Sequence, residues 1–124
     1  MNDLIQWLIN FAYDHNVSII ATRQLLPNTP SQTNVSNRVV VINMNWYNPI
    51  EIPFIYAHEI SHVLCGHVMA SPKNEIEANR KAVDLLIRYC QENNIYINNS
   101  VEFCEGFGIP LRLGYLIEDW YKVG

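Results

Sequence analysis

The sequence predicts one α+β domain over residues 1–124, in which a small antiparallel sheet packs on a bundle of helices. Three observations predict this class. A chain of 124 residues suffices for one hydrophobic core but not for two. Apolar residues make up 49% of the chain and charged residues 16%, which excludes a disordered chain. The order of elements is a helix, a few strands and then several helices, whereas a parallel α/β sheet alternates strands with helices.

The first half of the chain is expected to form the sheet. Five apolar residues at helical spacing predict an amphipathic helix over 3–15, with Asp3 as its N-cap. Short β-branched runs predict a strand at 17–21 and a stronger one at 38–44. The segment 27–37 between them is rich in Pro, Asn, Thr and Ser, so it is predicted to be a loop.

The second half is expected to be mostly helical. Apolar periodicity, with Pro near the starts and Gly near the ends, predicts four helices: 54–65, 73–91, 100–106 and 110–122. Gly66 is the expected stop of the first of these helices. A small β-like stretch is predicted at 95–97, between pairs of Asn residues.

The composition excludes several classes of function. The net charge is −4 and no run of Lys or Arg occurs, so the chain is not expected to bind nucleic acid directly. No apolar stretch approaches the roughly 18 residues that span a bilayer, and the first residues lack the features of a secretory signal. The three cysteines form no CxxC pair, which indicates a reducing compartment. We therefore expect a cytoplasmic protein that does not associate with membranes.

One segment carries recognisable chemistry, the run His58-Glu59-Ile60-Ser61-His62. Two histidines four residues apart on a helix project from the same face, so both imidazoles can reach one tetrahedral metal ion. Glu59 can then face the open coordination position and act as a general base toward water. The other interpretation is a pair of structural histidines bonded to backbone or carboxylate groups. Unpartnered polar groups in so apolar a helix cost roughly 1–3 kcal/mol each, and a metal would satisfy them together.

A catalytic zinc site needs a third protein ligand, and four residues are candidates. His67 does not have the spacing of the third histidine in the extended motif HExxHxxGxxH, and Cys65 is better explained as a small core residue. Glu75 and Glu77 remain, on the next predicted helix, and their side chains point in different directions, so at most one of them can bind.

Glu75 could be the third ligand, and Glu77 is the alternative. Asn79 lies four residues after Glu75 on the same face of the predicted helix. It could hydrogen-bond the free ring nitrogen of a ligand histidine and so orient it.

The pattern H-E-I-S-H, followed about a dozen residues later by E-x-E-A-N-x-x-A, resembles the ImmA/IrrE family of zinc metallopeptidases over about residues 38–87. The resemblance implies a zincin-like core with Zn²⁺ on His58, His62 and a glutamate, and Glu59 as general base. By analogy with related gluzincins, that glutamate is Glu75. Members of this family commonly occur in bacterial prophages and other mobile elements, where they cleave helix-turn-helix repressors.

The expected function is therefore a zinc-dependent endopeptidase whose protein substrate is a transcriptional repressor. The alternative is a non-catalytic, zinc-binding regulatory protein that sequesters a repressor or another partner. Substrate is expected to pair with the edge of the strand at 38–44. The oxyanion donor stays open among four residues: His67, Tyr89, Arg112 and Tyr115.

Overall fold

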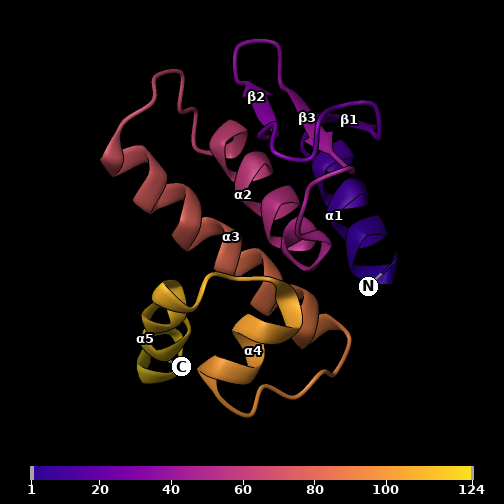
Figure 1. The fold of residues 1–124 in the computed structure, drawn as a ribbon. Coiled ribbons are helices and arrows are strands. Elements are labelled where there is room, and N and C mark those ends of the chain that lie inside the picture. The colour runs from indigo at the N-terminus through magenta and orange to yellow at the C-terminus, as the bar shows by residue number, and fades with distance from the viewer. Residues whose placement is uncertain (1, 124) are drawn as a thin grey trace.

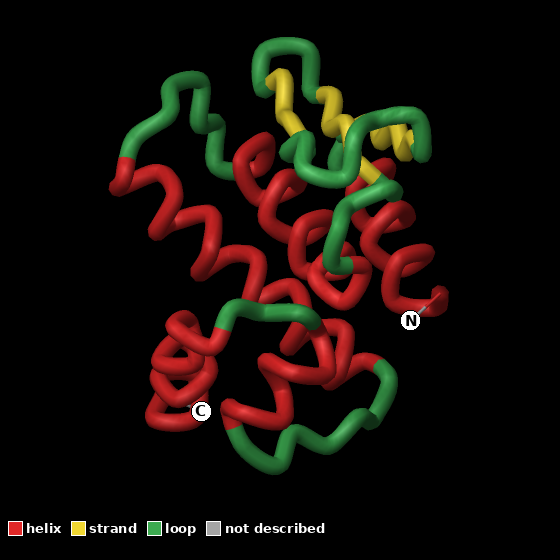
Figure 2. Tube along the Cα trace, in the orientation of Figure 1, coloured by secondary structure: helices red, strands yellow, loops and turns green. Residues whose placement is uncertain are grey.

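The structure is a computed structural model that describes the backbone of residues 2–123 and the side chains of residues 3–120. Within these residues it contains five α-helices and three strands in the order α1, β1, β2, β3, α2, α3, α4, α5. The strands gather at one end of the molecule, and α4 and α5 lie at the other end (Figures 1 and 2). The predicted α+β class is confirmed.

The sheet has the strand order β1-β3-β2. β1 (Ser18–Thr22) is parallel to β3 (Val39–Asn43), whereas β2 (Gln32–Asn34) is antiparallel to it. The prediction of an antiparallel sheet is therefore wrong, and the sheet is mixed. The physical reason is the path of the chain, which loops away from β1, adds β2 on the far side of β3 and returns through a tight turn.

β2 lies inside the segment 27–37, so the prediction of a loop there is partly wrong. The segment is held by the fully buried side chain of Asn43. Its amide donates hydrogen bonds to the carbonyl oxygens of Leu26 and Thr29 at 2.8 and 2.7 Å. Thr33 then pairs with Val40 of β3. β2 is polar and only three residues long, so its own sequence carries no hydrophobic pattern that predicts a strand. Contacts with residues elsewhere in the chain hold it in place.

One face of the sheet packs on helices. Val40 and Ile42 of β3 are fully buried, and β3 contacts α2 (Ile52–Leu64), whereas β1 contacts α1 (Asn2–Asp14). Of the α1 residues at helical spacing, Leu4, Leu8, Phe11 and Ala12 are buried as predicted, and Trp7 is partly buried. Asp3, however, lies within the first turn of α1 and is not its N-cap, because the helix already includes Asn2.

The helices α2 and α3 (Pro72–Glu92) form the centre of the molecule and pack along one another. Ala57, Ala78 and Ala82 are fully buried, and their small side chains allow this close approach. α2 ends at Leu64, and Gly66 follows with a φ of +71°, a left-handed conformation that favours glycine, as predicted. Ser71 caps α3 by accepting a hydrogen bond from the backbone N–H of Asn74 at 3.1 Å.

The C-terminal part contains α4 (Ser100–Phe107) and α5 (Gly114–Val123). The predicted helix at 110–122 begins later than expected, because a 3₁₀ turn at Leu111–Leu113 precedes it. The predicted stretch at 95–97 is not a strand, since no strand in the described part of the chain pairs with it. Within residues 2–123, no helix combines the length and the apolar character that crossing a bilayer requires.

Candidate metal and catalytic site

The two helices at the centre of the fold bring three ligand atoms to one point. His58 and His62 lie one turn apart on α2, and their Nε2 atoms are 3.1 Å from each other. Glu75, in the first turn of α3, places Oε2 2.9 Å from Nε2 of His58 and 3.4 Å from Nε2 of His62. We call His58, His62 and Glu75 the primary cluster.

The spacing of these atoms fits a zinc ion. Two ligands that each lie about 2.0–2.2 Å from a tetrahedral zinc ion are about 3.3–3.6 Å apart. The three separations in the primary cluster are at or slightly below this value. Two imidazoles and one carboxylate are also the donor set of known catalytic zinc sites. The residues of the primary cluster can therefore hold a zinc ion and leave a fourth position open.

Both histidines are suited to donate a lone pair. Burial lowers the pKa of His58, although the carboxylate of Glu75 opposes the shift. Burial and the neighbouring His58 lower the pKa of His62, and Glu75 again opposes the change. Because both pKa values lie below the ordinary value for histidine, both rings are neutral near neutral pH, which is the form that binds metals.

Glu59 lies beside the primary cluster but is held differently. Its Oε1 accepts a hydrogen bond of 2.7 Å from the hydroxyl of Thr33, and its Oε2 lies 3.8 Å from Nε2 of His58. One carboxylate oxygen is thus engaged, while the other faces the cluster. Burial raises the pKa of Glu59 to about 7, although the hydrogen bond from Thr33 opposes this shift. A carboxylate with such a pKa can accept and release protons near neutral pH.

Sequence reasoning missed Thr33, which the structure places within reach of Glu59. The hydroxyl of Thr33 is also 3.2 Å from the backbone oxygen of Glu59, so β2 is attached to α2 at this point. The only local signal was a Thr flanked by Gln and Asn within a polar segment. That pattern is typical of loops, and only the pairing of β2 with β3 brings Thr33 to the site.

Asn79 of α3 lies next to His58, on the side of the site near Arg112 of the C-terminal segment. The cavity there is lined by Phe54, His58, Glu75, Asn79 and Arg112 together with three further residues. The amide of Asn79 is near enough to His58 to oppose the lowering of the histidine's pKa, but Nδ1 of His58 is buried without a hydrogen bond of ordinary geometry.

Of the four residues considered as oxyanion donors, Arg112 lines the cavity that holds His58 and Glu75. His67 borders the opposite side of the site, but both of its ring nitrogens already have partners. Tyr89 packs on Trp7 at the other end of α3, and Tyr115 is exposed on α5.

A second group of ligand-type side chains lies next to the first. Cys65, His67 and Glu77 place their sulfur, nitrogen and oxygen atoms within 4.8 Å of one another, and we call them the second cluster. Nε2 of His67 is 2.6 Å from Oε1 of Glu77, and its Nδ1 is 3.0 Å from Nδ1 of His62. Glu77, the alternative third ligand, thus contacts His67, whereas Glu75 contacts His58 and His62.

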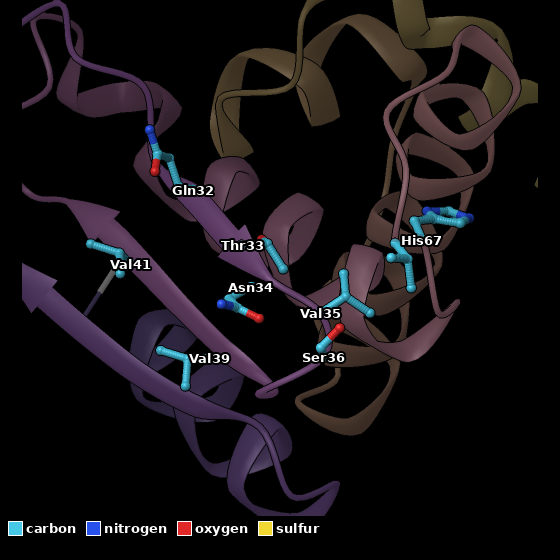
Figure 3. Close-up of a pocket in the computed structure, with 9 residues that line it drawn as sticks. Gln32, Thr33, Asn34, Val35, Ser36, Val39, Val41 and His67 are labelled. Carbon is cyan, nitrogen blue, oxygen red and sulfur yellow. The ribbon is translucent and has the colours of Figure 1, made fainter.

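A cleft borders the site on the side of the sheet. It is lined by Thr33, Val35, Glu59, His62 and Glu75 together with His67 and the loop after α2. A neighbouring hollow continues along β2 and β3 past His67 (Figure 3). The prediction that 38–44 offers a free strand edge is wrong, because β3 is the central strand and pairs on both sides. β2 is the outer strand on this side of the sheet.

Comparison of the chain with protein families, with curated proteins and with solved structures gives no match.

Proposed function

We propose that this protein is a zinc-dependent endopeptidase. The observation that carries the proposal is the convergence of His58 Nε2, His62 Nε2 and Glu75 Oε2 within 3.4 Å, with the partly buried carboxylate of Glu59 beside them. A purely structural pair of histidines requires no such convergence of three donors. The resemblance of the sequence motifs to the ImmA/IrrE family supports the same activity.

A zinc ion at the primary cluster would supply a Lewis acid that polarises the scissile carbonyl and acidifies water. The protein's own contribution is the handling of the proton. Glu59 has its Oε2 free and directed toward the cluster, so it is placed to accept a proton from the attacking water and to pass it to the leaving amine nitrogen. Thr33 fixes the carboxylate by binding the other oxygen, which leaves one orientation for the reaction.

The substrate is proposed to be a protein segment in extended conformation. β2 is an outer strand, and Thr33, with Val35 directly after the strand, borders the cleft that contains Glu59 and His62. An extended peptide can pair with such a strand through its backbone, which places a peptide bond near the primary cluster regardless of sequence. Among protein substrates, the resemblance favours a helix-turn-helix repressor of a phage or mobile element.

The test is the substitution Glu59→Gln, which preserves shape and removes the base. Zinc content is measured on purified protein by mass spectrometry of the metal, and cleavage is measured on a peptide library by mass spectrometry of the products. We expect zinc binding to remain and cleavage to fall by about 10²–10⁴-fold. Glu105→Gln, the same change at an exposed position on α4, should leave both unchanged.

The same measurements distinguish catalysis from the alternative function, in which the protein binds zinc and sequesters a partner. If the wild type binds zinc but cleaves neither the library nor a candidate repressor, and Glu59→Gln retains its biological effect, the protein sequesters its partner without catalysis. If the wild type binds no zinc under metal-replete conditions, both functions that depend on the primary cluster are excluded.

A further inference from the structure

A continuous line of polar atoms extends from the primary cluster to the surface through His62. Nε2 of His62 faces His58 and Glu75, whereas its Nδ1 is 3.0 Å from Nδ1 of His67. Nε2 of His67 is in turn 2.6 Å from Oε1 of Glu77. The His67 side chain is only 5% exposed, while the Glu77 side chain is 56% exposed, so the line runs from the interior to solvent.

The hydrogens along this line can be assigned because each neutral imidazole has one N–H donor and one acceptor nitrogen. An ionised carboxylate can only accept, so Glu77 requires that His67 carry its hydrogen on Nε2. Nδ1 of His67 is then an acceptor, and it must receive a hydrogen bond from Nδ1–H of His62. The remaining nitrogen of His62, Nε2, is left with a free lone pair directed at the primary cluster.

With both rings neutral, the opposite direction is incompatible with the contacts. If His62 carried its hydrogen on Nε2, its Nδ1 would need a donor, and His67 would have to provide it from Nδ1. The lone pair on Nε2 of His67 would then face a carboxylate oxygen at 2.6 Å with no hydrogen between them. Two acceptors at that distance repel one another. The charge on Glu77 therefore favours the tautomer of His67 with hydrogen on Nε2 and, through His67, the tautomer of His62 with hydrogen on Nδ1.

The spacing within the second cluster also argues against a second metal ion there. Two ligands of one zinc ion are about 3.3 Å or more apart. The separation of 2.6 Å between His67 and Glu77 lies further below this value than any separation in the primary cluster, where the shortest is 2.9 Å, and it is typical of a hydrogen bond to a charged group. Nδ1 of His67, the other donor atom of this ring, is directed at His62.

We propose that His67 and Glu77 are positioning residues that hold His62 in its metal-binding tautomer and ring orientation. This inference rests on the proposed function, because it assigns these two residues a role toward the same zinc site. Neither residue belongs to the primary cluster. His62 is thereby supported from behind by a histidine and a carboxylate on two different segments, the loop after α2 and the first part of α3.

The experiment compares the wild type with Glu77→Gln and with Glu92→Gln, the same change at the opposite end of α3. Glutamine at position 77 keeps the shape, but its amide can donate to Nε2 of His67 as well as accept from it, so both directions become allowed. Nitrogen-15 NMR of the metal-free proteins reports which ring nitrogen carries hydrogen, and a competition titration with a chelator reports zinc affinity.

In the wild type we expect hydrogen on Nδ1 of His62 and on Nε2 of His67. Glu77→Gln should give a mixture of tautomers at both rings and a loss of zinc affinity of about 10–100-fold, the range found when partners of metal ligands are removed. Glu92→Gln should match the wild type in both measurements.

Three results would overturn the inference. These are hydrogen on Nε2 of His62 in the wild type, an unchanged zinc affinity with unchanged tautomers in Glu77→Gln, or a second equivalent of zinc that disappears in Glu77→Gln. A wild type that binds no zinc refutes the proposed function. In that case the tautomers of the metal-free protein still decide whether the hydrogen-bond line has the proposed direction.

Discussion

The primary and second clusters contain similar residue types and share a border at His62, yet they differ in spacing. In the primary cluster, three ligand atoms are 2.9–3.4 Å apart and converge on one point. In the second cluster, His67 and Glu77 are 2.6 Å apart and form a line that leads away from that point. The number of histidines, cysteines and carboxylates does not separate a metal site from a hydrogen-bonded network. The distances and the assignment of hydrogens do.

The two clusters have similar burial, since each combines histidine side chains that are at most 17% exposed with a half-exposed carboxylate, Glu75 at 52% and Glu77 at 56%. The difference lies in Glu59 beside the primary cluster, whose side chain is only 13% exposed. A reacting group needs a site from which most water is excluded, whereas a carboxylate that orients a histidine by its charge can remain in contact with solvent.

The largest expected effect shows which of the two clusters binds zinc. His58→Ala should lower zinc affinity by at least about 100-fold, because two protein ligands hold a zinc ion much more weakly than three. Cys65→Ala should leave the zinc content unchanged, since the sulfur belongs to the second cluster. Zinc content and a chelator competition check both variants. Loss of zinc in Cys65→Ala with retention in His58→Ala would reverse the assignment of the two clusters.

A smaller effect is expected at Thr33, which supports the carboxylate beside the primary cluster. Thr33→Val keeps the shape and removes the hydroxyl that donates to Glu59 at 2.7 Å. We expect kcat to fall about tenfold, which corresponds to roughly 1.4 kcal/mol, close to the lower end of the range for a hydrogen bond to a charged group. Zinc content should not change. Thr29→Val, a matched change in the preceding loop, should leave kcat unaltered.

A change near the second cluster tests its dependence on backbone geometry. Gly66 has a φ of +71°, and no other atom lies within 4 Å of the position that an alanine methyl group would take, so Gly66→Ala meets conformational strain but no overlap. We expect a loss of about 1 kcal/mol in the free energy of unfolding, measured by urea denaturation. Gly106→Ala is the control, because Gly106 lies inside α4 with open space around it. Alanine there should stabilise the protein by up to about 1 kcal/mol.

The smallest effect concerns a carboxylate far from both clusters, and it shows what a titration unrelated to the site looks like. Glu92 accepts hydrogen bonds from Arg88 and from the indole of Trp7, at 2.9 and 3.0 Å. These contacts, that of Arg88 foremost, lower the pKa of Glu92. A lowered pKa means that the stabilisation is present above the ordinary pKa of a glutamate and is lost as the pH falls through the lowered value.

Glu92→Gln should therefore reduce the loss of stability between about pH 5 and pH 3, with little change at pH 7 in zinc binding or activity. Urea denaturation at a series of pH values measures this difference. An identical pH dependence in the wild type and in Glu92→Gln would show that the contacts of Glu92 with Arg88 and Trp7 contribute nothing measurable.

The sequence by itself determined the helices, the strong strand and the residues of the primary cluster. Helical spacing put His58, Glu59 and His62 on one turn, and the offset of two residues between Glu75 and Glu77 required that they face different ways. These features depend on contacts between residues close in the chain, which local patterns report.

Only the tertiary structure decided the direction of β1 relative to β3, the existence of β2 and the roles of Thr33 and His67. Thr33 and Glu59 are 26 residues apart, and His67 and Glu77 are separated by the loop between α2 and α3. A polar side chain takes its function from the partner that the fold places beside it. Because that partner lies far away in the sequence, no local pattern could predict these contacts.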